Sequence, residues 1–379
     1  MFRRAITLPF KLLGIPIRLD MSFLLILPLF AFLIASQLPA YVHLFAGNTS
    51  ADNLTQGATP YLLGLIAAIG LFTSVLIHEL GHAVIARIYG VETKEITLWF
   101  LGGLARFDDM PKQKGAEAIT AIAGPITSIL LAGVFWLLFR TPHNSAALAF
   151  VLGYLMTTNA ALAIFNLLPA LPLDGGRVLR SLLALRMPYI RATNVAGIVS
   201  RIIAILLGIY GLLNQELFLL AIAFFIYNAV TAETQYARIS EGLEHLTVKE
   251  VMSTEVSTVY PDMPLSQFIR LMYYKHHTGY PVVDFEDNLI GFIRLRDASQ
   301  FGENQEDPDL DTKTVADIMS KAETAFETDN ALETLKRIAS SQMGRFVVLN
   351  QLGKMVGIVS KTDLIKAIQN QGRSPTQTT

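Results

Sequence analysis

The chain has 379 residues, of which 52% are hydrophobic and only 16% charged, and its mean hydropathy is +0.44. These values exclude an ordinary soluble protein and are typical of a polytopic membrane protein. The sequence contains no cysteine, so disulfides and thiolate metal ligands are excluded, and any metal must be bound by His, Asp or Glu. Lys and Arg form no basic stripe, so nucleic acid is not an expected partner.

Charge divides the chain into two parts. Residues 1–240 carry 16 Lys and Arg against 11 Asp and Glu, whereas residues 241–379 carry 14 against 20. We therefore expect a membrane domain over 1–240, a soluble domain over 241–372, and a flexible polar tail at 373–379.

Six apolar segments are candidate membrane spans. They are residues 19–40, 61–89, 116–139, 146–168, 195–213 and 217–232. The last has only 16 residues, against the roughly 20 that a span needs. Between the second and third spans, β-branched and aromatic residues around Gly102 and Gly103 predict one or two strands with a turn at the glycines.

The positions of the basic residues predict the orientation of these spans. If the N-terminus lies in the cytoplasm, the outside loops contain only one basic residue, Arg140. The same orientation places the soluble domain in the cytoplasm. We therefore expect a multi-pass membrane protein whose N-terminus and soluble domain are both cytoplasmic.

The second span contains the sequence His78-Glu79-Leu80-Gly81-His82. In a helix, histidines at i and i+4 lie on one face, so both imidazoles can bind one Zn²⁺ while the glutamate lies beside the open metal position. Ionisable side chains within an apolar span usually face the bundle interior or a water-filled cavity. The alternative is a structural His/Glu cluster that is hydrogen-bonded inside the bundle.

A catalytic zinc has three protein ligands and one water. The best third ligand is Asp174, the only acidic residue between 145 and 215, which follows a Pro-rich stretch at the end of the fourth span. The alternative is that Asp174 and the next two glycines only form a turn. Asn166 could cap its helix, or it could hydrogen-bond a substrate carbonyl or a developing oxyanion. Asn159 is a weaker candidate of the same kind.

The soluble domain contains an internal repeat, with units at about 246–300 and 313–370. Residues 247–252 match 314–319 at an offset of 67, 279–283 match 344–348 at 65, and Asp297 matches Asp363 at 66. Each unit is predicted to contain a strand, an amphipathic helix, two strands and a short helix. Two such units can stack so that each buries the apolar face of the other.

These motifs together resemble the site-2 proteases, which are intramembrane zinc metalloproteases, and in particular a prokaryotic six-helix branch with paired cystathionine-β-synthase-like (CBS) domains. The resemblance rests on the HELGH sequence, Gly102-Gly103, Gly124-Pro125, the stretch from Asn166 to Arg177, and the soluble repeat. It implies a polytopic α-helical membrane domain of about six helices with a short membrane-associated β element, followed by an α/β tandem CBS module.

The resemblance also implies residue roles. Zn²⁺ would be bound by His78, His82 and Asp174, Glu79 would be the general base, Asn166 would assist the substrate or oxyanion, and Gly102 and Gly103 would lie in an element that aligns an extended substrate. The implied reaction is hydrolysis of a peptide bond in or near the transmembrane segment of a membrane protein, single-span or anti-sigma-like, in a prokaryotic plasma membrane.

The resemblance gives the CBS pair a regulatory role. Such pairs often form homodimers and bind an adenine nucleotide, such as ATP or AMP, between their units. The pattern from Ser360 to Asp363 fits a ribose-binding site, whereas Arg294 to Asp297 departs from it. The alternative is a dimerisation or docking module without a ligand. Two other functions stay open: a CBS-regulated transporter or channel, and an inactive scaffold that binds membrane helices without cutting them.

Overall fold

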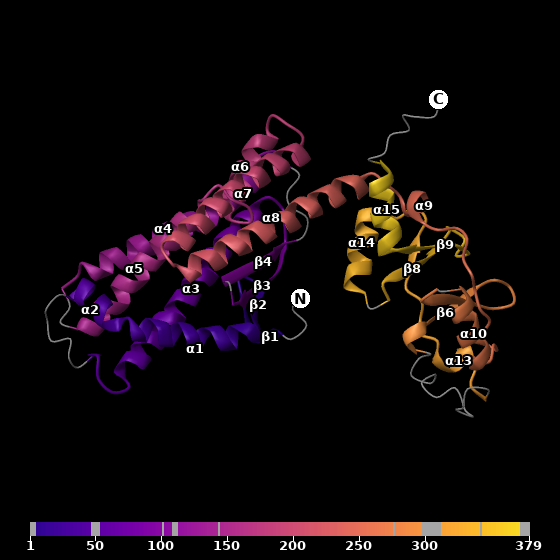
Figure 1. Ribbon diagram of the computed structural model, residues 1–379, viewed down its shortest axis with the longest axis horizontal. Helices are drawn as coiled ribbons and strands as arrows, with labels where there is room; N and C mark the ends of the chain where they lie inside the picture. Colours follow the sequence, from indigo (N-terminus) through magenta and orange to yellow (C-terminus); the bar gives the residue numbers. More distant parts are fainter. Residues whose placement is uncertain are drawn as a thin grey trace. The chain divides into compact units, whose positions relative to one another are not determined.

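A computed structural model describes the chain at residues 5–46, 54–100, 102–107, 113–142, 145–275, 277–297, 312–341 and 343–371. The predicted tail at 373–379 lies outside the described residues. Internal contacts divide the chain into a first unit, Met1–Gln235, and a second unit, Tyr236–Thr379 (Figure 1). Each unit has hydrophobic clusters of its own.

Long apolar helices form most of the first unit. Within the described residues, five are long and apolar enough to cross a membrane: α3 (Thr59–Ile88), α4 (Ala116–Phe139), α5 (Ala146–Asn166), α7 (Tyr189–Leu213) and α8 (Leu217–Glu244). They confirm the last five predicted spans. Small residues let the helices approach closely: a Cβ added to Gly64 of α3 would overlap the backbone carbonyl of Ala31 in the neighbouring helix.

The first predicted span, 19–40, is not one continuous helix. The elements in this part of the chain are β1 (Ala5–Leu12), β2 (Ile15–Asp20), α1 (Met21–Ser36) and α2 (Leu38–Ala46). Helix α1 begins after Asp20 because the Asp20 carboxylate accepts a hydrogen bond from the Ser22 N–H at 3.0 Å. Helix α1 ends at Ser36 with Gln37 as its C-cap, and α2 follows at an angle of 61°. The two helices form a sixth span only if they cross the membrane together.

A four-stranded sheet accompanies the helices. Its order is β1-β2-β3-β4, with β3 at Thr93–Trp99 and β4 at Gly102–Phe107, and only the β2–β3 pair is parallel. The two strands predicted after the second span are therefore confirmed. The glycines do not form the turn, because Trp99 pairs with Gly102, and both glycines are the first residues of β4. Strand β4 is an edge of the sheet.

In the last third of the first unit, the structure excludes one alternative and lengthens one predicted span. A short loop after α5 leads into helix α6 (Asp174–Ala184), so Asp174 begins a helix rather than only forming a turn. Helix α8 has 28 residues, many more than the apolar run within it. It is longer because the polar residues after 232 continue the helix, which passes the boundary between the units and ends at Glu244.

The second unit contains the repeat. Its elements are α9 (Val248–Val251), α10 (Leu265–Lys275), β5 (Gly279–Val283), β6 (Leu289–Arg294), α13 (Val315–Ile318), β7 (Thr324–Phe326), α14 (Ala331–Ser340), β8 (Arg345–Leu349), β9 (Met355–Ser360) and α15 (Lys361–Gln371). The predicted amphipathic helices and strand pairs are confirmed. Gly279 pairs with Arg294, and Arg345 pairs with Ser360. The offset at these strands is therefore 66, and the expected match of Gly279 with Gly344 is wrong by one residue.

Candidate metal centre

Two histidines of α3 lie in the interior of the first unit. His78 and His82 are only 3% and 4% exposed. They are four residues apart and so lie on one face of the helix, with their ring centroids 4.9 Å apart. A buried imidazole is costly unless its nitrogens have partners, so the partners of these nitrogens are informative.

The Nδ1 atoms of both rings contact α4. His82 Nδ1 lies 2.8 Å from the backbone carbonyl oxygen of Thr120, which can only accept a hydrogen bond. Nδ1 of His82 therefore carries the proton, and Nε2 is left with its lone pair. His78 Nδ1 lies 2.8 Å from Ser128 Oγ, which can accept in the same way. This arrangement is typical of metal-binding histidines.

The Nε2 atoms converge with Asp174. Asp174 Oδ2 lies 3.2 Å from His78 Nε2 and 3.3 Å from His82 Nε2, and the two Nε2 atoms are 3.3 Å apart. The three side chains predicted as ligands are therefore together, with one ligand atom of each within 4.8 Å of the others.

Gly124 of α4 faces both histidines. A Cβ at this position would overlap Nε2 of both His78 and His82, so only glycine leaves the converging atoms free. No role at the site is predicted from the sequence for Gly124, Thr120 or Ser128. Their spacing of four residues could have predicted their position, because it places small and polar residues on one face of an apolar span.

The loop and helix that carry Asp174 pack tightly. A Cβ on Gly175 would overlap the carbonyl oxygens of Leu167 and Leu168, and a Cβ on Gly176 would overlap the backbone of Ala170. The first turn of α6 therefore lies directly on the preceding loop. This close approach explains why two glycines follow the aspartate.

The Glu79 side chain extends from α3 towards β4. Its Oε2 accepts a hydrogen bond from the Ala105 N–H at 3.1 Å. A Cβ on Gly103 would lie 2.5 Å from Glu79 Cγ, so glycine is required there. Gly102 has a φ of 129°, which favours glycine, but its nearest contact would be with Val75 at 4.0 Å. The predicted β element thus lies beside the predicted general base through Gly103 and Ala105.

Among the described residues, no hydrogen bond links Asn166 to His78 or His82. It is the last residue of α5, and its side-chain amide donates to the carbonyl of Leu162 in the same helix at 3.0 Å. Its role with substrate or oxyanion stays a prediction. Asn159 is fully buried and donates to Ser74 Oγ at 3.0 Å, one turn before His78. Its Oδ1 has no hydrogen-bond partner among the described residues.

The predicted nucleotide residues lie at the start of α15. The N–H and Oγ of Ser360 donate to Asp363 Oδ2 at 2.9 Å and 2.6 Å. Arg345, which pairs with Ser360 across the strands, also donates to Thr278 Oγ1 of the other repeat.

The first repeat differs at the equivalent position. Arg294 donates from Nε and Nη2 to the two carboxylate oxygens of Asp297, at 2.7 Å and 2.9 Å. The Asp297 carboxylate is therefore already bound by its own chain.

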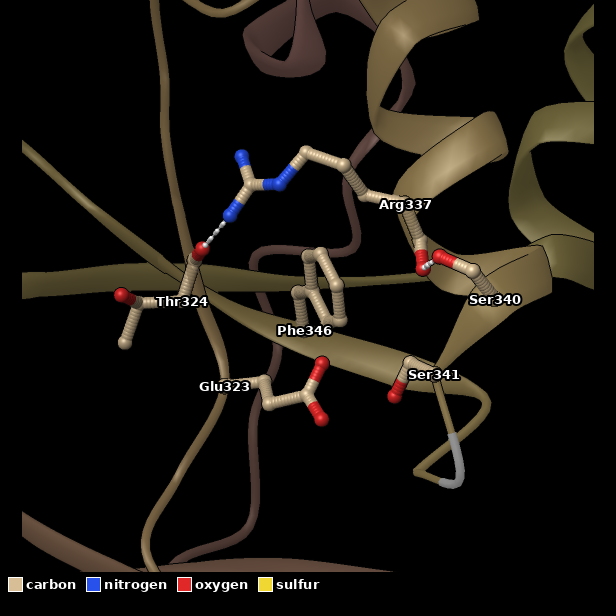
Figure 2. Close-up of a pocket in the computed structure, with 6 residues that line it drawn as sticks. All are labelled: Glu323, Thr324, Arg337, Ser340, Ser341 and Phe346. Atoms are coloured by element: carbon tan, nitrogen blue, oxygen red, sulfur yellow. Dashed lines mark hydrogen bonds between the residues drawn. The ribbon is translucent and has the colours of Figure 1, made fainter. Parts of the chain in front are cut away.

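A cavity of about 420 Å³ lies in the second repeat (Figure 2). Its lining consists of Glu323, Thr324, Arg337, Ser340, Ser341 and Phe346. The Arg337 guanidinium lies 5.0 Å from the centre of the Phe346 ring and donates to the Thr324 carbonyl at 2.7 Å. The cavity contains neither the metal-site residues nor the predicted nucleotide residues, so we assign it no role.

The donor atoms at the histidines fit zinc. Two imidazole nitrogens and one carboxylate oxygen are a ligand set of catalytic zinc sites, which keep a fourth position for water or substrate. Calcium and magnesium prefer shells made of oxygen atoms alone. The Nδ1 contacts add to the fit because they leave Nε2 of His82 available for the metal.

Comparisons with known proteins agree with this geometry. The peptidase family M50 matches residues 66–144 and 140–210, and the CBS domain matches residues 248–302 and 315–370. The zinc metalloprotease MJ0392 of Methanocaldococcus jannaschii is 30% identical over 95% of both chains. The putative zinc metalloprotease Rip3 of Mycobacterium tuberculosis is 30% identical over 94% of this chain and 91% of its own.

A solved structure, the site-2 protease from Methanocaldococcus jannaschii, is 31% identical, with 61% of this chain and 95% of that chain covered and a TM-score of 0.43. These sequence relatives are named as zinc metalloproteases, in one case as a putative one, so they do not support the transporter or channel that the sequence left open. This chain therefore belongs to peptidase family M50, the site-2 protease family of integral membrane zinc metalloproteases, and carries a C-terminal pair of CBS domains.

Proposed function

We propose that the protein hydrolyses a peptide bond in or near the transmembrane segment of a membrane-protein substrate. In this proposal His78, His82 and Asp174 are the zinc ligands and Glu79 is the general base. The observation that carries it is the convergence of ligand atoms from α3 and α6 within 4.8 Å, in the interior of an apolar helix bundle.

The chemistry assigns one role to each group. Zinc held by His78, His82 and Asp174 would supply Lewis-acid chemistry, which lowers the pKa of a water to about 7 and polarises a carbonyl. Glu79 takes a proton from the attacking water and delivers it to the leaving amide nitrogen. The Ala105 N–H holds the Glu79 carboxylate at 3.1 Å, which orients the base before substrate arrives.

The edge of the sheet suits an extended substrate. Peptide bonds in a helix are shielded, so the substrate helix must unwind locally before cleavage. Its exposed backbone can add to edge strand β4, as peptides add to other sheet edges. Gly103 has no side chain at the point where β4 approaches Glu79, and this lets the strand place substrate backbone next to the base.

The charge distribution supports the orientation part of the proposal. The N-terminus and the CBS pair are cytoplasmic, because basic residues flank the spans on that side. From the family resemblance we further propose that the membrane is a prokaryotic plasma membrane and that the CBS pairs of two chains form a homodimer.

Proteolysis in a defined membrane tests the proposal. The purified full chain is placed in liposomes with a single-span membrane protein as substrate. Cleavage is expected within or beside the span, with loss of cleavage when a zinc chelator is added and recovery when Zn²⁺ is returned. Cleavage that a zinc chelator does not affect would rule out the proposed chemistry.

We also propose that the CBS pair binds one adenine nucleotide per chain and thereby regulates proteolysis. The two repeats differ in a way that supports a single site. Among the described residues, the Asp363 carboxylate accepts hydrogen bonds from the N–H and Oγ of Ser360 at the start of its own helix, and these groups can rearrange towards a ribose. Asp297 is held by both nitrogens of the Arg294 fork, an arrangement that resists displacement.

Replacing Asp363 with Asn is therefore expected to raise the Kd for ATP about tenfold or more, because a hydrogen bond to a charged group is lost. Asp297→Asn is the matched control in the first repeat, and the Kd is expected to stay within about twofold because that carboxylate does not meet the nucleotide. Calorimetric titration of the full chain in detergent measures both Kd and stoichiometry. Two nucleotides per chain, or equal effects of the two variants, would contradict the single site.

A further inference from the structure

A group of charges centred on the buried Arg180 joins α6 to two other helices. Arg180, six residues after Asp174 on α6, is only 4% exposed. Its Nε donates to Glu117 Oε1 of α4 at 3.1 Å, and its Nη2 contacts the same oxygen. Its Nη1 donates to Glu233 Oε1 of α8 at 2.7 Å. The ring of Tyr189, at the start of α7, lies 5.2 Å from the guanidinium. We call Arg180, Glu117 and Glu233 the charge clamp.

The charge clamp is not explained by stability alone. Taking a guanidinium and a carboxylate out of water is costly, and apolar side chains of similar size are often equally stable in their place. Ionisable groups that face the interior of a membrane bundle are usually retained for function. The clamp belongs to neither the predicted ligands nor the predicted base, so its role must come from the helices that it connects.

Two of these helices supply the metal site. Helix α4 begins next to Glu117 and holds the histidine rings through Thr120 and Ser128. Helix α6 begins with Asp174. Contact between the same two helices continues at Ser181, whose Oγ accepts from the Ala118 N–H at 3.2 Å. The Arg180–Glu117 pair therefore fixes the helix that carries the carboxylate ligand against the helix that orients the imidazoles.

The third helix leads to the CBS pair. Ile226 and Val230 of α8 pack in one buried cluster with Ala170 and Leu171, in the loop before Asp174. Glu233 follows one turn later, and the same helix continues to Leu243, which is fully buried in a hydrophobic cluster of the second unit. Glu233 is thus the clamp residue on the segment that enters the CBS pair.

We infer that Arg180 is a positioning residue for the metal site, because it fixes α6 and with it Asp174. The Arg180–Glu233 contact makes the position of α6 depend on the position of α8. This inference rests on the proposed zinc site. When the Arg180–Glu233 contact is intact, α6 is fixed at α4 and Asp174 stays at the histidines. A displacement of α8 that breaks this contact loosens α6 and lowers the affinity of the site for zinc.

The test measures zinc retention and the mobility of α6 in the full chain. Zinc retention is measured against a competing chelator, and hydrogen–deuterium exchange is measured for peptides that cover 174–184. The variants are Arg180→Met, Arg180→Lys and Glu233→Gln. The control is Arg186→Met, which removes the same charge from an exposed position just after α6.

Arg180→Met is expected to weaken zinc binding about 10–100-fold, as changes beside metal ligands usually do. Glu233→Gln is expected to weaken it about tenfold and to speed exchange in 174–184. Arg180→Lys keeps the charge, but a lysine ammonium lacks the planar fork that contacts both carboxylates. The zinc affinity of this variant is therefore expected to lie between those of wild type and Arg180→Met. The double variant Arg180→Met/Glu233→Gln is expected to equal Arg180→Met alone.

The inference is overturned if Arg180→Met and Glu233→Gln match Arg186→Met in both measurements, or if the double variant shows the product of the single effects. Glu233→Gln keeps the Arg180–Glu117 pair, so it tests the clamp even if Arg180→Met does not fold. A wild-type chain that holds no zinc would instead contradict the proposed function, and the exchange of 174–184 would still test the clamp.

Discussion

Replacing Glu79 with Gln is expected to lower kcat about 1,000-fold, in the range found when a general base is removed. A glutamine amide has the same shape, but it cannot accept the proton of the attacking water. Its carbonyl oxygen can still accept the hydrogen bond from the Ala105 N–H, so the side chain keeps its position. The three predicted zinc ligands are unchanged, and zinc is expected to stay bound with wild-type affinity.

Single-turnover cleavage of a reconstituted single-span substrate measures this loss, and metal analysis of the same sample measures zinc. Glu92→Gln is the matched control, because it makes the same chemical change at an exposed position just after α3. It is expected to cleave at the wild-type rate. A Glu79→Gln enzyme that keeps the wild-type rate would exclude Glu79 as the base. A wild type with bound zinc and no activity on any membrane substrate would favour the inactive scaffold.

The second large effect is expected at Gly124, which no motif for metal ligands includes. Gly124→Ala places a methyl group where Nε2 of both His78 and His82 lies, so at least one imidazole must turn away. Zinc affinity is expected to fall about 100-fold or more, at the upper end for residues that orient metal ligands. Cleavage is expected to fall with it, because the base then has no activated water.

Gly133→Ala is the matched control for this variant. Gly133 lies on the same helix, and a Cβ there would meet nothing within 4 Å. Alanine is also a better helix former than glycine, so the control tests whether any loss arises from α4 as a whole. Equilibrium competition with a zinc chelator measures both variants. Equal zinc affinities for Gly124→Ala and Gly133→Ala would show that α4 does not confine the histidines.

Much of the membrane unit and of the candidate site could be predicted because the signals are local. Long apolar runs define α3, α4, α5 and α7, and the i, i+4 spacing puts His78 and His82 on one helix face. Asp174 could be found because it is the only acidic residue in a long apolar region. These inferences needed no knowledge of how the helices pack.

What the sequence missed depends on contacts between distant segments. Strands β1 and β2 precede the first predicted span and were not predicted, because β2 pairs with β3, more than 70 residues later. The role of Gly124 could not be predicted because its contact with two histidines exists only after α3 and α4 pack. Arg180 looked like a topology signal, because its partners Glu117 and Glu233 are far away in sequence.

The length of the last helix shows a different limit. The apolar run ends near residue 232, so hydropathy alone predicted a marginal span. Helix α8 nevertheless continues to Glu244, because residues with good helical propensity follow and Leu243 is buried in the second unit. Packing at the far end of the helix, which hydropathy does not report, decides where it stops.

The most direct measurement of the central claim is the zinc content of the purified full chain and of Asp174→Asn. We predict one zinc per wild-type chain. For Asp174→Asn, in which a carboxylate ligand becomes a neutral amide of the same size, we predict a loss of zinc to the chelator, while the circular dichroism spectrum stays that of a folded helical protein. A folded Asp174→Asn chain that holds zinc with wild-type affinity would contradict a metal site built by α3 and α6.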